Sequence, residues 1–174
     1  MRYRRATVAG AAYFFTVNLA DRQSALLTEY IADLRHVIRR IKHVHPFRIN
    51  AWVVLPDHLH MIWTLPPGDA DFATRWMLIK ATFSRVIPAG EKRSASRIAK
   101  GERGIWQRRY WEHLIRDEDD LARHVDYIHI NPVKHGLATR AADWLHSSIH
   151  RHVRLGMINA DWAGVIAVGG DFGE

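Results

Sequence analysis

The sequence contains no cysteine among its 174 residues, which excludes disulfides and thiolate metal ligands. A metal ion would therefore have to be held by imidazole nitrogen and by oxygen. The sequence also lacks a run of eighteen apolar residues, so we expect no transmembrane helix and no membrane partner. Its N-terminus lacks the apolar stretch and the cleavage site of a signal peptide. These absences predict a cytoplasmic protein.

Acidic residues are the minority: 18 Asp and Glu stand against 25 Lys and Arg, which gives a net charge of +7. Such a balance favours a polyanionic partner, either nucleic acid or a membrane surface. The excess is concentrated in residues 91–109, here called the basic stretch, and three aromatic residues lie in or beside it: Trp106, Tyr110 and Trp111. Cations for phosphates and aromatic rings for bases suit single-stranded nucleic acid. The alternative is a solvated loop followed by a core strand.

Hydrophobic alternation of period two predicts strands at 12–19, 47–55, 58–65 and 109–115. Helical spacing predicts helices at 28–44 and 118–130, one that Asp71 caps and that ends near Pro88, and a further helical piece within 143–155. This order is the split pattern of ferredoxin-like folds with an added helix. We therefore predict an α+β fold, a ferredoxin-like antiparallel sheet with helices packed on it. Residues 1–162 would form a single domain, and 163–174 would be a flexible C-terminal tail.

A His-x-His pattern occurs at three places, and only His58 and His60 fall on a predicted strand. Side chains at i and i+2 of a strand project from the same face, about 6–7 Å apart. Two imidazoles at that spacing can hold one metal ion, because neutral histidine is a common metal ligand. The alternative is that both histidines lie on the solvated face of an amphipathic strand.

A polar stripe on the helix predicted at 118–130 contains Asp120, His124, Tyr127 and Asn131. A tyrosine hydroxyl has a pKa near 10 and needs a base or a metal-bound electrophile before it can act as a nucleophile. Tyr127 and the histidine pair therefore form one joint hypothesis for a catalytic site. Tyr127 could instead be a boundary aromatic residue. Asn131 is followed by Pro132, which disfavours helical angles at Asn131. Asn131 could therefore either cap a turn or reach the metal.

Two segments, AWVVLPDHLHMIW (51–63) and YIHINPVKHGL (127–137), resemble the signature blocks of the REP-associated tyrosine transposases, which belong to the HUH superfamily. Supporting segments occur in the same order, and the resemblance covers about residues 13–164. It implies a metal-dependent endonuclease and strand transferase that acts on single-stranded or hairpin DNA. Such a protein would be associated with the nucleoid.

The resemblance also implies roles for individual residues. The catalytic residues would be Tyr127, His58 and His60, with Tyr127 forming a 5′-phosphotyrosine link and releasing a 3′ hydroxyl. Mg²⁺ or Mn²⁺ would be bound by His58, His60 and Asn131, although related transposases commonly carry glutamine or a carboxylate at the last position. The DNA contacts would be Lys80, Arg85, Trp106, Arg108 and Arg109.

Three further questions stay open at the level of sequence. The chain could be a catalytically inactive protein that binds hairpin DNA or RNA, or a metal hydrolase that uses activated water. It could be a monomer or a homodimer, with the tyrosine serving its own histidines or those of a partner. The C-terminal tail could lie over the active site or contact DNA.

Overall fold

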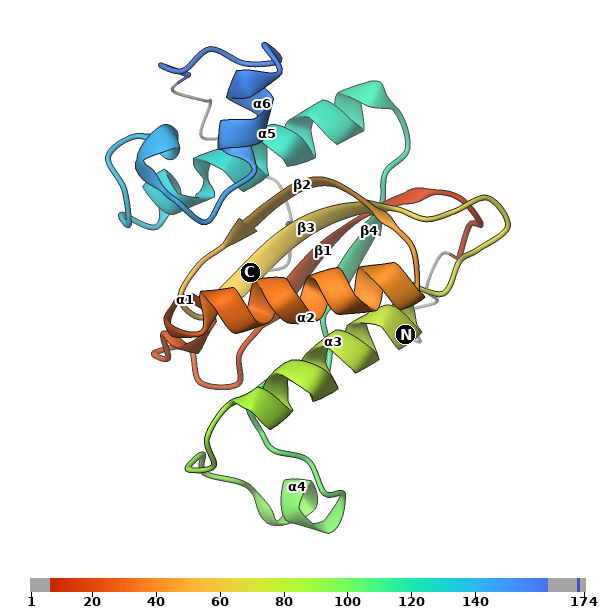
Figure 1. Ribbon diagram of the computed structural model, residues 1–174, viewed down its shortest axis with the longest axis vertical. Coiled ribbons are helices and arrows are strands. Elements are labelled where there is room, and N and C mark those ends of the chain that lie inside the picture. Colours follow the sequence, from red (N-terminus) through yellow and green to blue (C-terminus); the bar gives the residue numbers. More distant parts are fainter. Residues whose placement is uncertain (1–6, 163–171, 173–174) are drawn as a thin grey trace.

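The computed structural model describes residues 7–162 and Phe172 (Figure 1). Within these residues, one antiparallel sheet has the strand order β2-β3-β1-β4. The four strands are β1 (Ala12–Asn18), β2 (Arg48–Val54), β3 (His58–Thr64) and β4 (Trp111–Leu114). This order confirms the ferredoxin-like sheet. No helix in the described part of the chain is long and apolar enough to cross a membrane.

The helices follow the predicted order with three corrections. They are α1 (Leu26–Glu29), α2 (Ile31–Val44), α3 (Phe72–Val86), α4 (Ala95–Ala99), α5 (Glu118–Lys134), the 3-10 turn η1 (Ala141–Asp143) and α6 (Ile149–Arg154). The first predicted helix is divided at Tyr30, and the basic stretch contains the short α4. Helix α5 continues through Pro132 to Lys134, four residues beyond the predicted end at Ile130. Apart from Phe172, the predicted tail lies outside the described residues.

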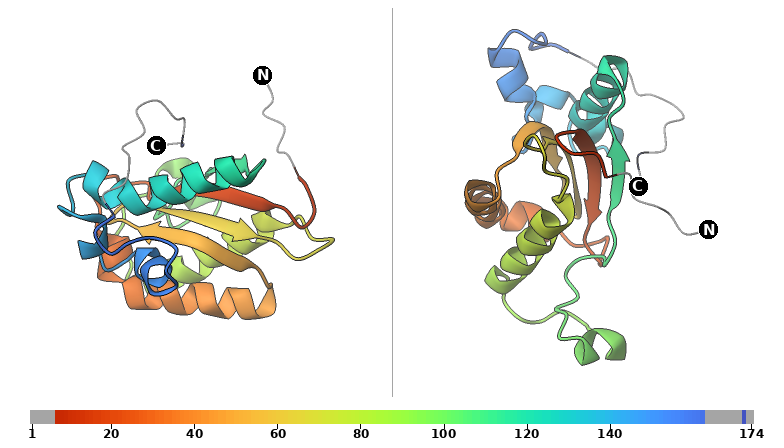
Figure 2. Two further views of the ribbon diagram at one scale, coloured as in Figure 1. Left: turned by 90° about the horizontal axis from the view of Figure 1, so that it is seen from above. Right: turned by 90° about the vertical axis from the view of Figure 1, so that its right-hand side faces the viewer.

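The sheet separates two layers of helices. Helices α2 and α3 cover one face, whereas α5 and α6 lie on the other (Figure 2). Beneath α2 and α3 is a large core that includes Phe15, Met61 and Trp63, all fully buried. Beneath α5 is a smaller core that includes Phe14 and Ile62. Because side chains alternate along a strand, neighbouring residues of β1 and β3 serve different cores.

Alternation along β3 fixes the side to which the histidines point. Met61 and Trp63 belong to the core under α2 and α3. His58 and His60 have the opposite parity and face α5, where both are buried. The alternative of a solvated histidine pair is wrong, because α5 covers this face.

One buried arginine joins the loop before β2 to the start of α3. Arg75 forms an ion pair with Asp69 at 2.6 Å and donates to the backbone carbonyls of His45, Pro46 and Asp71 at 3.2, 2.7 and 2.6 Å. A guanidinium has five N–H donors in a fixed planar fork, so one side chain can hold several acceptors at once. Arg75 therefore fastens the edge of the sheet to α3.

Replacement of Arg75 by alanine should lower the free energy of unfolding by about 3 kcal/mol, because it leaves buried carbonyls without a donor. Urea denaturation would measure the change. Arg39→Ala is the matched control, since Arg39 is exposed on α2, and it should cost less than about 0.5 kcal/mol. Equal stability of the two variants would show that the Arg75 contacts contribute nothing.

Candidate active site

The two histidines of β3 lie side by side under α5. Their ring centroids are 5.0 Å apart, and the planes are nearly perpendicular at 84°. His58 and His60 are 1% and 0% exposed, so neither imidazole is in contact with bulk solvent. The pair is therefore held in place by packing rather than free to rotate in water.

Hydrogen bonds at Nδ1 fix the orientation of both rings. His58 Nδ1 lies 2.7 Å from Asp57 Oδ1, and His60 Nδ1 lies 2.9 Å from Thr16 Oγ1. The Thr16 hydroxyl donates its one proton to the carbonyl of Phe172 at 2.6 Å, so it accepts from His60. A protonated Nδ1 directs the lone pair of a neutral imidazole to Nε2. Such outer hydrogen bonds are typical of metal-binding histidines.

Asp57 is held in its charged form. Burial alone would raise the pKa of this carboxyl, but the hydrogen bond with His58 and the nearby Arg22 guanidinium outweigh burial and lower the pKa. Arg22 Nε lies 2.7 Å from Asp57 Oδ2. An ionised carboxylate is the stronger acceptor for His58 Nδ1–H, and this makes the imidazole a better electron donor at Nε2.

Tyr127 comes from the middle of α5 and faces the histidines of its own chain. Its ring centroid is 5.3 Å from that of His60, and the planes meet at 74°. The Lys134 ammonium donates to the tyrosine hydroxyl at 3.1 Å and lies 4.8 Å from the ring centre. Phe172 stacks on the Tyr127 ring, with the two ring centroids 3.7 Å apart. The structure thus brings the predicted nucleophile and the histidine pair together within one chain.

Asn131 is fully buried on the same stripe of α5. It lies one turn from Tyr127, which contacts His60, and one turn from His135, whose ring centroid is 5.1 Å from that of His58. Asn131 is therefore bracketed by two contacts with the histidine pair. The predicted helix end at Ile130 is wrong, because Asn131 lies within α5. Its carbonyl accepts a regular helical hydrogen bond from the His135 N–H, because the proline costs α5 only one donor.

A second cluster joins β4 to the first turns of α5. His113 Nε2 lies 2.8 Å from Asp120 Oδ2, and His124 Nδ1 lies 3.2 Å from Asp120 Oδ1. Among the described residues, this is the set of three histidines and carboxylates whose donor atoms are close enough to hold a metal ion. However, the two imidazoles are stacked at 4.6 Å with planes only 15° apart. Lone pairs in parallel planes do not converge on one ion, so the cluster fits a hydrogen-bond network around Asp120 better.

Asp120 carries the charge of this network. Burial would raise the pKa of its carboxyl, but hydrogen bonds from His113 and from the Arg116 N–H, together with the nearby histidines, lower it overall. The pKa of His124 is lowered, mainly by burial. Asp120 therefore ties the edge strand β4 to α5, the helix that presents Tyr127.

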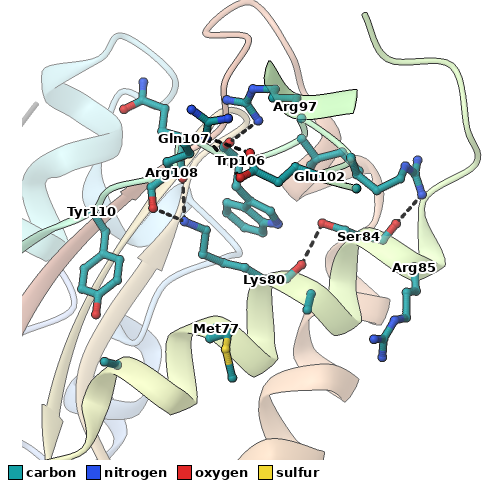
Figure 3. Close-up of a pocket in the computed structure, with 16 residues that line it drawn as sticks. Met77, Lys80, Ser84, Arg85, Arg97, Glu102, Trp106, Gln107, Arg108 and Tyr110 are labelled. Atoms are coloured by element: carbon teal, nitrogen blue, oxygen red, sulfur yellow. Dashed lines mark hydrogen bonds and ion pairs between the residues drawn. The ribbon is translucent and has the colours of Figure 1, made fainter. Parts of the chain in front are cut away.

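The predicted DNA contacts lie on the opposite side of the sheet. Lys80, Arg85, Trp106 and Arg108 line one cavity of about 730 Å³ beside α3, and Arg109 is exposed next to it (Figure 3). Figure 3 shows the guanidinium of Arg85 directed away from Trp106. Trp106 was expected to offer an exposed ring to a DNA base. Its indole is instead 5% exposed and packs on Phe83, so it is no surface platform for a base.

Several residues of the site were missed from the sequence. Asp57 was not among the predicted site residues, although an acidic residue directly before the histidine pair is a usable signal. Lys134 follows Tyr127 by seven residues, which places it on the same face of a helix, but the helix was expected to end before it. Thr16 gave no signal, because its pairing with His60 joins residues 44 positions apart.

A helix-borne tyrosine facing two histidines on a central strand of a ferredoxin-like sheet defines the class of single-tyrosine transposases. The family described as "Transposase IS200 like" matches residues 7–131. This chain belongs to that family.

Similarity to characterised relatives extends over nearly the whole chain. The REP-associated tyrosine transposase of Escherichia coli K12 is 50% identical over 93% of this chain and 90% of its own length. A Haemophilus influenzae protein provisionally given the same name is 44% identical over 93% of both chains. A solved structure of a REP-associated tyrosine transposase bound to a REP hairpin matches with a TM-score of 0.87 and 48% identity, covering 100% of this chain and 97% of that one.

Replacement of Asp120 by asparagine should cost about 2 kcal/mol of stability at neutral pH, because it removes the charge from two buried hydrogen bonds. The pKa of the Asp120 carboxyl is lowered in the folded state, so the contribution is fully present above the ordinary aspartate pKa of 3.8 and is lost as the pH falls through the folded-state pKa. Urea denaturation at several pH values between 7 and 3 would measure this. The wild type and the variant should converge in acid.

Asp119→Asn provides the matched control, since Asp119 is exposed in the same first turn of α5 and interacts with the same helix dipole. It should change stability by less than about 1 kcal/mol. A pH-independent difference between Asp120→Asn and the wild type would contradict the assigned charge.

Proposed function

We propose that this protein is a metal-dependent endonuclease and strand transferase for single-stranded DNA that recognises hairpin-forming repeats and cuts them through a 5′-phosphotyrosine intermediate. The observation that carries the proposal is the position of Tyr127 beside the histidine pair. Its ring centroid lies 5.3 Å from the ring centroid of His60 in the same chain. Membership of the IS200-like transposase family agrees with it. So does the 48% identical transposase that was solved with a REP hairpin.

The donor set fits a divalent cation. His58 and His60 would bind it through Nε2, since both Nδ1 atoms have other hydrogen bonds, and Asn131 could add an amide oxygen. We propose Mg²⁺ or Mn²⁺, which both accept oxygen and water alongside imidazole. When bound, such an ion withdraws charge from the scissile phosphate and stabilises the leaving 3′ oxygen.

The chain's own residues account for the transfer step. The Tyr127 oxygen attacks the scissile phosphorus as the bond from phosphorus to the 3′ oxygen breaks. The tyrosine loses its proton and the 3′ oxygen gains one, so no nucleotide cofactor is consumed. The Lys134 ammonium, 3.1 Å from the tyrosine oxygen, stabilises the negative charge that develops there. Attack by another 3′ hydroxyl on the phosphotyrosine bond reverses the step and joins the strands.

Access to Tyr127 requires a local change. Tyr127 is 5% exposed, and the Phe172 ring stacks on its ring. The backbone carbonyl of Phe172 also accepts a hydrogen bond from the Thr16 hydroxyl. Phe172 covers one face of the Tyr127 ring, so that face is closed to a DNA strand. We expect the bound strand to displace Phe172.

Cationic residues on the α3 side would hold the DNA beyond the catalytic face. Arg108 and Arg109 are exposed, and Lys80 of α3 lines the cavity beside them. Arg85 adds an exposed charge on the outer side of the helix. Phosphate contacts of this kind provide affinity without sequence preference.

Tyr127→Phe should abolish the covalent protein–DNA adduct, because the phenyl ring has no oxygen for the phosphorus. The assay is a denaturing gel of labelled hairpin DNA incubated with protein and Mn²⁺ or Mg²⁺. Tyr30→Phe, which removes a hydroxyl between α1 and α2, should form the adduct at the wild-type rate. An adduct in Tyr127→Phe would remove Tyr127 from its role. Binding without cleavage by the wild type would favour an inactive hairpin-binding protein.

Asp57→Asn should raise the metal concentration needed for half-maximal adduct formation by about 10–100-fold, because His58 loses its charged hydrogen-bond partner. The rate at saturating metal should largely recover. Asp21→Asn is the control, as Asp21 is an exposed acid in the loop after β1. Titration of Mn²⁺ against initial rates measures both variants. An unchanged metal requirement in Asp57→Asn would mean that His58 does not bind the ion.

A further inference from the structure

One guanidinium lies at the end of the catalytic face, the side of the sheet that α5 covers, without a part in the proposed chemistry. It belongs to Arg22, in the loop that follows β1. The Thr16 side chain contacts His60, so it faces α5. Asn18 is two residues further along β1 and pairs with His58 across the sheet, so it faces the same side. Arg22 Nη1 donates to Asn18 Oδ1, which brings the guanidinium to this face as well.

The loop that carries Arg22 is fastened to the turn before β3. The Leu19 N–H donates to the carbonyl of Asp57 at 2.8 Å, and the Leu27 N–H donates to the carbonyl of Pro56 at 3.1 Å. Arg22 Nε lies 2.7 Å from Asp57 Oδ2. Two backbone hydrogen bonds and an ion pair thus hold the guanidinium in one place. A side chain that is already held loses little entropy when it binds a ligand.

The held guanidinium keeps donors for a further ligand. Of its five N–H groups, one on Nε is used by Asp57 and one on Nη1 by Asn18. The other three, on Nη1 and Nη2, have no acceptor among the described residues, and the side chain is 40% exposed. A planar fork of N–H groups matches the oxygens of a phosphate. Arg22 is therefore built to contact an anionic group that arrives from solvent.

The neighbouring acids make this a contact of short range. Asp57 Oδ1 lies 2.7 Å from His58 Nδ1, so the carboxylate serves an imidazole and a guanidinium at once. Asp57 offsets the charge of Arg22, and Asp21 of the same loop accepts from the Gln23 N–H at 2.9 Å. Binding by Arg22 then depends on directed N–H donors and not on a long-range field. Such a contact suits one phosphate of a strand.

The position along the sheet indicates which phosphate this is. The Tyr127 ring lies against His60, whereas Asn18 and the bound guanidinium lie at the level of His58. These two levels are separated by two residues of β3, about 6–7 Å. A strand whose scissile phosphate is at the tyrosine therefore offers Arg22 a different phosphate, one further along the chain.

We propose that Arg22 binds the phosphate next to the scissile one and so aligns the DNA strand over the histidine pair. The proposal rests on the proposed function, because it takes single-stranded DNA as the substrate. It assigns a substrate contact to a residue outside the metal site and the tyrosine helix. Asp57 then has two tasks, since one oxygen orients His58 and the other holds the guanidinium that receives the strand.

Arg22→Gln tests the contact, because glutamine can still reach a hydrogen-bond partner but has no cationic fork. Arg39→Gln makes the same change at an exposed arginine of α2 and is the matched control. Asp57→Asn separates a direct contact from a relayed one, since it alters the partner of His58 and keeps the guanidinium on Asn18. Thermal unfolding of all four proteins would verify that they are folded.

Binding would be measured by fluorescence anisotropy without metal, with a hairpin oligonucleotide that carries single-stranded flanks. A series of probes would replace each flank phosphate in turn by a neutral methylphosphonate. For the wild type, we expect binding to weaken about tenfold at the linkage beside the one cleaved in the adduct assay, the effect of losing a charge-assisted hydrogen bond. Arg22→Gln should bind the intact probe about tenfold more weakly and lose nothing further at that linkage. Asp57→Asn and Arg39→Gln should keep the wild-type sensitivity there.

Full sensitivity of Arg22→Gln at that linkage would overturn the proposal. So would loss of the sensitivity in Asp57→Asn, because the effect would then be relayed through the carboxylate. The adduct assay with the wild type separates these outcomes from a failure of the proposed function. An adduct without a linkage that depends on Arg22 would reject the contact but keep the chemistry, whereas such a linkage without an adduct would do the reverse.

Discussion

The two-residue period of β3 is the constraint on which the rest of the site depends. Met61 and Trp63 are fully buried under α2 and α3, and this fixes the parity of the strand. His58 and His60 then point to α5, because adjacent residues of a strand face opposite sides. A slip of one residue would bury the imidazoles among aromatic side chains and expose apolar ones, which the hydrophobic effect opposes. Since β3 lies between β2 and β1, both neighbours hold it in register.

Helix α5 is the second rigid part, and its first turn is fastened to the sheet. At its start, Asp120 joins it to His113 of β4. At its end, the helix continues through Pro132, so that Lys134 reaches back to the Tyr127 hydroxyl. Between these ends, the Tyr127 ring packs against Phe14 and His60. A nucleophile held by packing loses little entropy when the substrate binds, which is what positioning in a catalytic site requires.

The sequence allowed the fold and the central residues to be predicted because both depend on local periodicity. Period two along 58–65 and helical spacing around Tyr127 are visible without any long-range information. The missed residues depend on the register between distant segments, as in the pairing of Thr16 with His60. Trp106 was misplaced because its basic surroundings indicate a surface, whereas a β-bridge with Leu19 draws the indole into the core. The end of α5 differs from the prediction because Pro132 disfavours helical angles at the residue before it, whereas the packing of the helix on β2 and β3 keeps Asn131 helical.

Positively charged side chains are distributed unevenly around the sheet. One face carries the imidazoles, the tyrosine and the covering helix α5, with Lys134 beside the tyrosine. Much of the net charge of +7 lies in the connection from α3 to β4, beside the other face. Asn18 pairs with His58 across the sheet, and its carbonyl accepts a hydrogen bond from the Gln107 N–H. The backbone at this end of the sheet therefore joins the strand that carries the histidine pair to the basic stretch.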